Sequence, residues 1–218
     1  EYYGVDESKL KQFSIWISMF VKGDFGTSLI YRQDVLSIIK DRFFTSFTLM
    51  GTSWILSGIF GYVLGVIAGM NEGSMIDRVI KLYSFVLAST PAFWIGILFL
   101  IIFSVWLGIF PIGLATPVGM LAEEVTLFER MKHIILPALT LSVIGVANIT
   151  LHTRQKMIEI KNSEFIRFAR AKGEYGITLF WRHGLRNSLF PAISLHFATF
   201  GELFGGAILV EQVFSYPG

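Results

Sequence analysis

Long uncharged stretches alternate with short charged stretches along this chain. The residues between Arg42 and Glu72 carry no charge, and neither do those between Lys81 and Glu123. A helix needs about 20 mostly apolar residues to cross the hydrocarbon core of a bilayer. The pattern therefore predicts four membrane-spanning helices, at about 43–70, 82–108, 134–153 and 187–210.

The apolar stretches are continuous, which favours helices over the short alternating segments of a membrane barrel. Backbone groups cannot find hydrogen-bond partners in lipid, so a helix that satisfies its own backbone is the default solution. We therefore expect an all-α membrane protein with the architecture of a polytopic helical bundle.

The composition agrees with a membrane protein and narrows the chemistry. Hydrophobic residues make up 53% of the 218 residues and charged residues 16%, against about 25% charged in soluble domains. The chain has no cysteine, which excludes disulfides and thiolate metal sites. No HExxH spacing, no nucleophile–base arrangement and no GxxxxGK[ST] loop is present. We expect no bound metal, no nucleotide on this chain and no enzymatic activity.

Lysine and arginine set the orientation, because cytoplasmic loops of membrane proteins carry an excess of both. The loop at 154–186 holds eight basic and three acidic residues. We predict that this loop is cytoplasmic, that 71–81 is also inside, and that both ends of the chain lie outside. Its basic residues would meet anionic lipid or a partner protein, and nothing suggests nucleic acid.

The first 42 residues form a separate, extracytoplasmic amphipathic segment in this interpretation, and 43–218 form the transmembrane domain. The segment would contain a helix that either lies on the outer surface of the membrane or packs on the spans. Asp34 is expected to cap a second short helix leading into the first span. One face of the first helix is apolar: Leu10, Phe13, Trp16, Ile17 and Phe20.

Glycines at intervals of four mark helix-packing faces in two of the spans. Small residues allow close approach of another helix. That helix could belong to this chain or to a second membrane subunit. The first span carries Gly61, Gly65 and Gly69, and the fourth carries Gly201 and Gly205.

Two further residues within the predicted spans attract attention. Pro91 is expected to kink the second span, either as a hinge or only as a structural bend, with Ser89 or Thr90 binding the freed carbonyl. Glu202 is an acid inside the fourth span, where an ionisable group is costly and suggests a functional site. It could line the translocation path and contact a cationic substrate, pair with a partner subunit, or face water.

The cytoplasmic loop is expected to contain two short helices. Ser163 would cap a helix that begins at Glu164 and ends at Gly173 in the left-handed conformation. Its residues Phe165, Phe168 and Ala169 would share a face, with Ile166 beside it. Pro191 would occupy the first turn of the fourth span. Such a capped helix indicates a docking element for a partner. The alternative is a basic loop lying on anionic headgroups.

The stretch from Phe165 to Pro191 resembles the EAA loop of ABC-importer permeases. Its Arg167-Phe168-Ala169, followed by Gly173, differs from the general acidic-Ala-Ala pattern. Together with Arg182-His183-Gly184-Leu185-Arg186-Asn187, it is similar to the dipeptide/oligopeptide/nickel branch of these permeases. Three other stretches resemble the same branch: Gly23–Ser28, Ser89–Trp94 and Gly205–Gly218.

The resemblance implies a type I ABC importer permease that moves di- or oligopeptides, or a related solute such as a nickel complex, across the cytoplasmic membrane of a prokaryote. Its partners would be a second permease subunit, two ATPase subunits that use ATP and Mg²⁺, and an extracellular or periplasmic binding protein. Such permeases usually have six spans, so we expect the first and last to lie outside this sequence. The residues implied in coupling to the ATPase are Glu164, Arg167, Ala169, Ala171 and Gly173.

Two alternatives stand beside this interpretation. A secondary transporter or channel subunit that needs no ATP would draw on Glu202 and Pro91, and it predicts ion sites at broken helices. The sequence shows no equivalent of such a site. An intramembrane enzyme is the other alternative, and no catalytic pair supports it.

Overall fold

The computed structural model describes residues 8–117, 119 and 124–218. These residues are helical apart from turns, loops and an isolated bridge between Thr27 and Asp34, and the predicted all-α class is confirmed. The chain divides into two compact units, one up to Thr45 and one from Ser46 to Gly218. The division lies close to the predicted boundary at residue 42.

The first unit contains helix α1 (Lys9–Val21), none of whose residues is buried. Its apolar face forms a run of ring contacts, from Phe13 to Trp16 to Phe20 and on to Phe25, with ring centroids 5.1–6.0 Å apart. Asp34 accepts a 3.1 Å hydrogen bond from the backbone N–H of Ser37, as expected of a cap. The separate short helix predicted after Asp34 is wrong, because α2 (Val35–Met70) is continuous.

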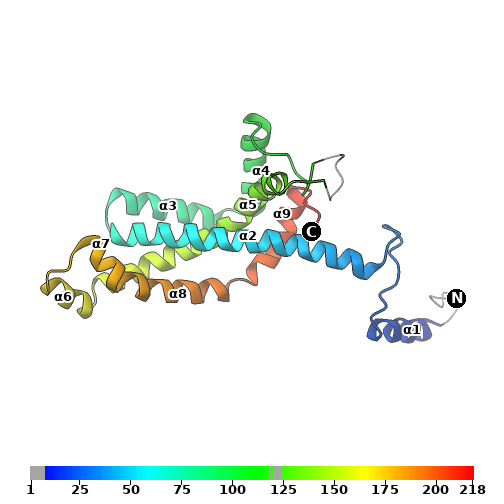
Figure 1. Ribbon diagram of the computed structural model, residues 1–218, viewed down its shortest axis with the longest axis horizontal. Helices are drawn as coiled ribbons and strands as arrows, with labels where there is room; N and C mark the ends of the chain where they lie inside the picture. Colours follow the sequence, from blue (N-terminus) through cyan, green and yellow to red (C-terminus); the bar gives the residue numbers. More distant parts are fainter. Residues whose placement is uncertain (1–7, 118, 120–123) are drawn as a thin grey trace. The chain divides into compact units, whose positions relative to one another are not determined.

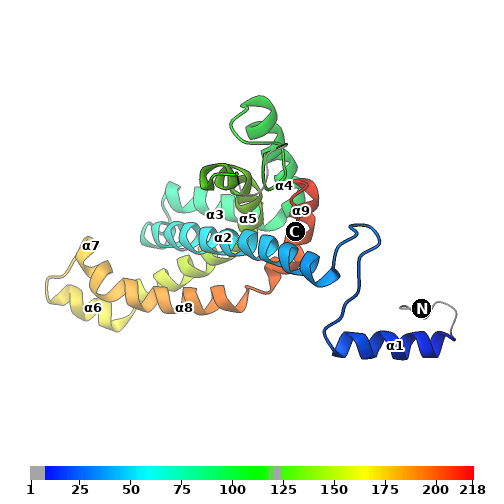
Figure 2. The same cartoon turned by 45° about the vertical axis from the view of Figure 1, so that its right-hand side comes forward.

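Helix α5 (Leu127–Lys161) is the central helix of the second unit. It begins with a capping box between Thr126 and Glu129 and extends beyond the predicted 134–153 into the loop. In the most apolar 18-residue stretch of α5, 67% of the residues are buried, whereas in that of α2 the share is 39%. Figures 1 and 2 show α3, α8 and the later part of α2 running alongside it.

The second predicted span is not one continuous helix. It consists of α3 (Met75–Ser89), α4 (Ala92–Phe99) and the π-helical segment η1 (Leu100–Trp106), with a bend of 107°. Pro91 causes the break, because a residue before proline avoids the helical region and Thr90 is extended at φ −104°, ψ 129°. The Thr90 hydroxyl donates to the carbonyl of Val86 at 2.7 Å, which ends the helix with a partner for that oxygen.

The fourth predicted span is also broken. It consists of α8 (Leu185–Ala198) and α9 (Glu202–Val213), bent by 64°. Pro191 lies inside α8, not in its first turn, because the helix begins at Leu185. By length and composition two helices can cross a membrane, or up to four spans if each bent pair counts as one.

The core of the second unit is built around α5. Leu136 and Leu141 of α5 meet Leu49 of α2 and Val210 of α9, and Phe214 closes the cluster at 1% exposure. Three short segments follow α5: α6 (Glu164–Ala171), α7 (Gly176–Leu179) and the π-helical η2 (Phe180–Gly184). Figures 1 and 2 show α6 and α7 gathered at one end of the bundle, where α8 begins.

Candidate functional site: the loop helix and its support

Helix α6 has one face buried in its own chain and one face free. Ile166 and Ala169 are 3% and 4% exposed and pack in a cluster with Met157 and Ile160 of α5. Phe165 and Phe168 are 44% and 63% exposed. Of the predicted face, Ala169 is therefore buried together with the neighbouring Ile166, whereas Phe165 and Phe168 are exposed. The free face presents two aromatic rings at the end of the bundle.

The end of α6 is fixed by a complete left-handed stop. Gly173 has φ +90°, its N–H donates to the carbonyl of Arg170 at 2.9 Å, and the N–H of Glu174 donates to Ala169 at 3.1 Å. This pair of bonds is the Schellman pattern, which confirms the predicted stop at Gly173. Ser163 occupies the N-cap position, but its hydroxyl donates to the carbonyl of Ile160, so the predicted side-chain cap is wrong.

Glu174 links the end of α6 to η2. It accepts a 2.9 Å hydrogen bond from Arg182 and lies 3.0 Å from Nε2 of His183. Partial burial raises the pKa of the Glu174 carboxyl, but the hydrogen bonds of His183 and Arg182 outweigh this effect and hold the pKa below its usual value. The segment after α6 is therefore tied down by charge as well as by backbone geometry.

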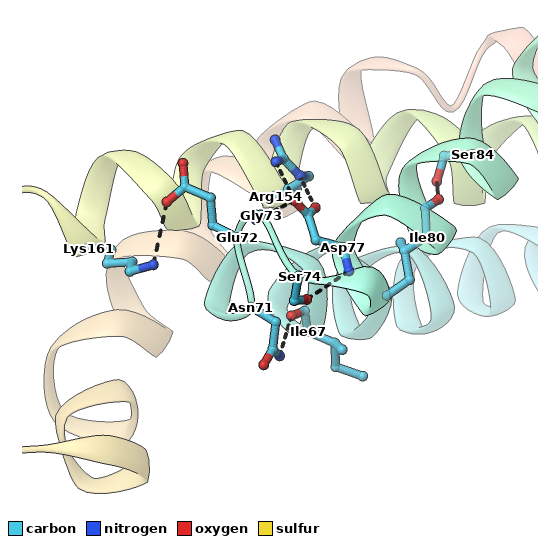
Figure 3. A network of polar contacts seen from close by, with 10 residues as sticks. All are labelled: Ile67, Asn71, Glu72, Gly73, Ser74, Asp77, Ile80, Ser84, Arg154 and Lys161. Carbon is cyan, nitrogen blue, oxygen red and sulfur yellow. Dashed lines mark hydrogen bonds and ion pairs between the residues drawn. The ribbon is translucent and has the colours of Figure 1, made fainter.

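A buried ion pair connects α5 to α3 at the same end of the bundle (Figure 3). The Arg154 guanidinium donates to both carboxylate oxygens of Asp77, at 2.5 and 2.9 Å. Asp77 also accepts from the backbone N–H of Gly73 at 2.9 Å, and Ser74 caps α3. Lys161 reaches Glu72 at 3.4 Å in a more exposed pair.

Four of the five predicted coupling residues are accessible to a partner. Glu164, Arg167, Ala171 and Gly173 are exposed, whereas Ala169 is buried and seats α6 on α5. Beside the helix lies a groove of about 350 Å³. Ile166 of α6, Met157 of α5 and Gly69 of α2 line it, together with residues of α7 and η2.

The glycines of α2 pack within the chain. A Cβ added to Gly65 would lie 2.5 Å from Cβ of Thr153 and 2.7 Å from the carbonyl oxygen of Thr150. Gly61 and Gly69 face Ile149 and Met157 in the same way. This stripe therefore sets the close approach of α2 to α5, one of the two alternatives the sequence left open.

The remaining predicted residues lie away from α6. Gly201 and Gly205 have no heavy atom within 4 Å of a Cβ position, so their faces are open in this chain. Glu202 is exposed at the first turn of α9, beside the break in the fourth span. Pro91 stands at the break between α3 and α4. The structure brings none of these next to the loop helix.

Sequence reasoning missed two paired contacts. Asp77 and Arg154 lie at the ends of neighbouring spans, on the side predicted to be cytoplasmic. Their opposite charges on the same side were the only signal in the sequence that could have indicated the pair. Trp54 and His196 were not paired, because nothing in an apolar run indicates which aromatic rings meet. Their rings stack with centroids 4.4 Å apart and an angle of 9°.

The site holds no evident metal centre. Among the described residues, no group of three or more His, Asp or Glu side chains could bind an ion. The arrangement around α6 instead offers a firmly seated helix with exposed aromatic and charged groups, which suits contact with another protein.

A helical bundle with two broken spans and a short helix seated at one end is what the membrane subunit of a transporter requires. The family profile described as "Binding-protein-dependent transport system inner membrane component" matches residues 61–218. The chain belongs to this family, whose members form the membrane component of ABC importers. Such importers also contain an ATPase and a substrate-binding protein, and ATP hydrolysis takes place in the ATPase subunits.

Curated relatives match along the entire chain. The oligopeptide transport system permease protein AppB of Bacillus subtilis (strain 168) is 36% identical over 219 residues, covering 100% of this chain and 68% of the relative. The glutathione transport system permease protein GsiC of Escherichia coli (strain K12) is 35% identical over 215 residues, covering 99% of this chain and 66% of the relative. The chain thus spans about two thirds of the length of these relatives.

Proposed function

We propose that this chain is one of two permease subunits of an ATP-driven importer of short peptides in the cytoplasmic membrane of a prokaryote. Two ATPase subunits would bind ATP and Mg²⁺, and an extracellular binding protein would deliver the substrate. This chain itself would hold no cofactor. The observation that carries the proposal is α6, a helix anchored by Ile166 and Ala169 with Phe165 and Phe168 exposed, at the position expected of the coupling helix.

The peptide substrate is inferred from the relatives. AppB is named for oligopeptides and GsiC for glutathione, which is itself a short peptide. A nickel complex is the other solute implied by the family resemblance. Unlabelled peptides and Ni²⁺ complexes are each added as competitors in the uptake assay. The competitor that reduces uptake identifies which of the two solutes is the substrate.

The contacts support a route for force from the ATPase to the spans. Closure of the ATPase subunits would push on α6, whose buried face contacts Met157 and Ile160 of α5. Arg154 of α5 is tied to Asp77 of α3, so α3 would follow α5. The bends at Pro91 and before Glu202 then supply places where the spans can pivot.

Reconstitution tests the proposal. The chain, its second permease and the ATPase are purified together and placed in liposomes with the binding protein. ATP-dependent uptake of labelled peptide, together with disulfide cross-linking of a Phe168→Cys variant to the ATPase, is the expected result. Failure of the chain to purify with any ATPase would contradict the proposal.

Broken spans also occur in ATP-independent secondary transporters, the alternative that the sequence left open. Membership of the ABC-importer family argues against that alternative. It predicts uptake by this chain in liposomes without ATPase, driven by an ion gradient alone, so the same liposomes assayed with and without ATP test it.

A further inference from the structure

Two polar side chains of the bundle face one cavity and have no bonding partner among the described residues. Asn148 comes from the middle of α5 and Glu202 from the first turn of α9, and both are exposed. The cavity has a volume of about 100 Å³ and lies among α2, α5, α8 and α9. An amide and a carboxylate from separate helices thus converge on one space in the membrane domain.

A second acid in α9 shows that Glu202 is unusual. Glu211 accepts a 2.6 Å hydrogen bond from the hydroxyl of Ser46, so its charge is satisfied inside the chain. The start of α9 favours the negative charge of Glu202 through the helix dipole, but it supplies no side-chain partner. Ionisable groups in membrane spans characteristically face a water-filled path or a partner, and the open cavity favours the path.

A ring pair closes one side of this cavity. The Trp54 indole donates to the carbonyl of His196 at 3.1 Å, and Nε2 of His196 lies 2.8 Å from the carbonyl of Trp54. Gly58 leaves room for the pair, because a Cβ there would lie 2.8 Å from Nε2 of His196. Beyond the pair, toward the α6 end of α2, lies an apolar cavity of about 380 Å³ that the same two rings line.

We propose that the cavity lined by Asn148 and Glu202 receives the positively charged amino group of a peptide during transport. The Glu202 carboxylate would accept charge-assisted hydrogen bonds from the ammonium, and the Asn148 amide oxygen would accept another. The cavity is small compared with the ~300–1,000 Å³ of sites that hold drug-sized ligands. It therefore binds the end group of the peptide and does not recognise the peptide side chains. This inference rests on the proposed function as a peptide importer.

Thiol labelling tests the cation preference. These 218 residues contain no cysteine, so Asn148→Cys introduces a single thiol among them, and mass spectrometry of the peptide that carries residue 148 reads its modification. The assembled transporter is treated with 2-aminoethyl and with 2-sulfonatoethyl methanethiosulfonate, which are cationic and anionic. We expect the ratio of the cationic to the anionic reaction rate to exceed that of free cysteine roughly tenfold or more, because a charged cleft concentrates ions of opposite sign.

The control is a matched change of charge in the same helix. Adding Glu202→Gln to Asn148→Cys should return the ratio of rates to that of free cysteine, whereas adding Glu211→Gln should leave the preference intact. A ratio of rates equal to that of free cysteine in the variant that keeps Glu202 would overturn the inference. So would a thiol that reacts with neither reagent in the assembled transporter, because the second permease would then cover it.

Uptake separates this inference from the proposed function. Labelled trialanine and glutathione are both offered to the reconstituted transporter. For whichever peptide the wild type imports, Glu202→Gln should reduce uptake about tenfold, Glu202→Asp should restore part of it, and Glu211→Gln should match the wild type. Wild-type uptake that Glu202→Gln leaves unchanged would overturn the inference alone, and wild-type liposomes without ATP-dependent uptake would overturn the proposed function.

Discussion

The Arg154 guanidinium donates hydrogen bonds to both carboxylate oxygens of Asp77, and the side chains of Arg154 and Asp77 are only 15% and 1% exposed. The pair joins α5 to the first turn of α3. It lies at the end of the bundle where α6 is seated on α5. A displacement of α6 therefore reaches two membrane helices rather than one.

Loss of Arg154 should weaken the fold strongly. Arg154→Ala leaves the Asp77 carboxylate buried without its ionic partner, and breaking a buried pair in this way costs about 3–5 kcal/mol. We expect a clear fall in the melting temperature of the purified transporter in detergent.

The neighbouring pair provides the control. Lys161 and Glu72 are 3.4 Å apart with side chains 37% and 39% exposed, and exposed pairs contribute about 0–1 kcal/mol. Lys161→Ala should therefore change the melting temperature little. Equal losses for Arg154→Ala and Lys161→Ala would show that burial does not set the strength of these pairs.

Two alanines of α6 should respond differently to a bulky replacement. Ala171 is exposed, so Ala171→Trp should leave the chain folded but obstruct the ATPase contact. Uptake should fall at least tenfold while basal ATP hydrolysis continues. A tenfold fall corresponds to about 1.4 kcal/mol. Substrate-stimulated ATP hydrolysis at the wild-type level would count against this view.

Ala169→Trp is the matched variant two residues away. Ala169 is 4% exposed and packs beside Ile166, so a large ring there overfills the seat of α6. We expect a loss of about 1–3 kcal/mol in stability, as for other overpacked sites. A melting temperature equal to that of Ala171→Trp would refute the assignment of buried and free faces.

Much of the fold could be predicted because its signals are local. Uncharged runs marked all four regions of membrane helix, Asp34 marked a cap, and Gly173 marked the end of α6. The bends were not predicted, because hydropathy gives the length and polarity of a helix and not the direction of its axis. Pro91 indicated a kink, but the angle of 107° depends on how α4 packs against its neighbours.

The candidate site was predicted in its location and only partly in its geometry. The spacing placed Phe165, Phe168 and Ala169 on one face with Ile166 beside it, but only packing against α5 decides that Ile166 and Ala169 are buried and both rings exposed. The partner of Arg154 lies 77 positions away in sequence, and no local pattern indicates such a pairing. Contacts between distant helices require the fold itself.

Glycines of the two stripes should differ in their tolerance of a methyl group. Gly65→Ala places a Cβ 2.5 Å from Cβ of Thr153, and separation of α2 from α5 should cost about 1–3 kcal/mol. Gly205→Ala meets no atom within 4 Å, so the chain alone should keep its stability or gain about 0.5–1 kcal/mol from reduced backbone freedom. Thermal unfolding of each purified variant measures both effects, and equal destabilisation would contradict the packing of α2 on α5.

Acid should release the segment that follows α6. Because hydrogen bonds hold the folded pKa of Glu174 below its ordinary value of 4.5, its contribution is present above that value and is lost as the pH falls through the folded pKa. A nitroxide label on exposed Thr178 should therefore be immobile near pH 7 and become mobile as the pH falls below about 4.5. Glu174→Gln should make the label mobile already at pH 7 and abolish the acid response. An immobile label in Glu174→Gln at neutral pH would show that the links to Arg182 and His183 do not hold this segment.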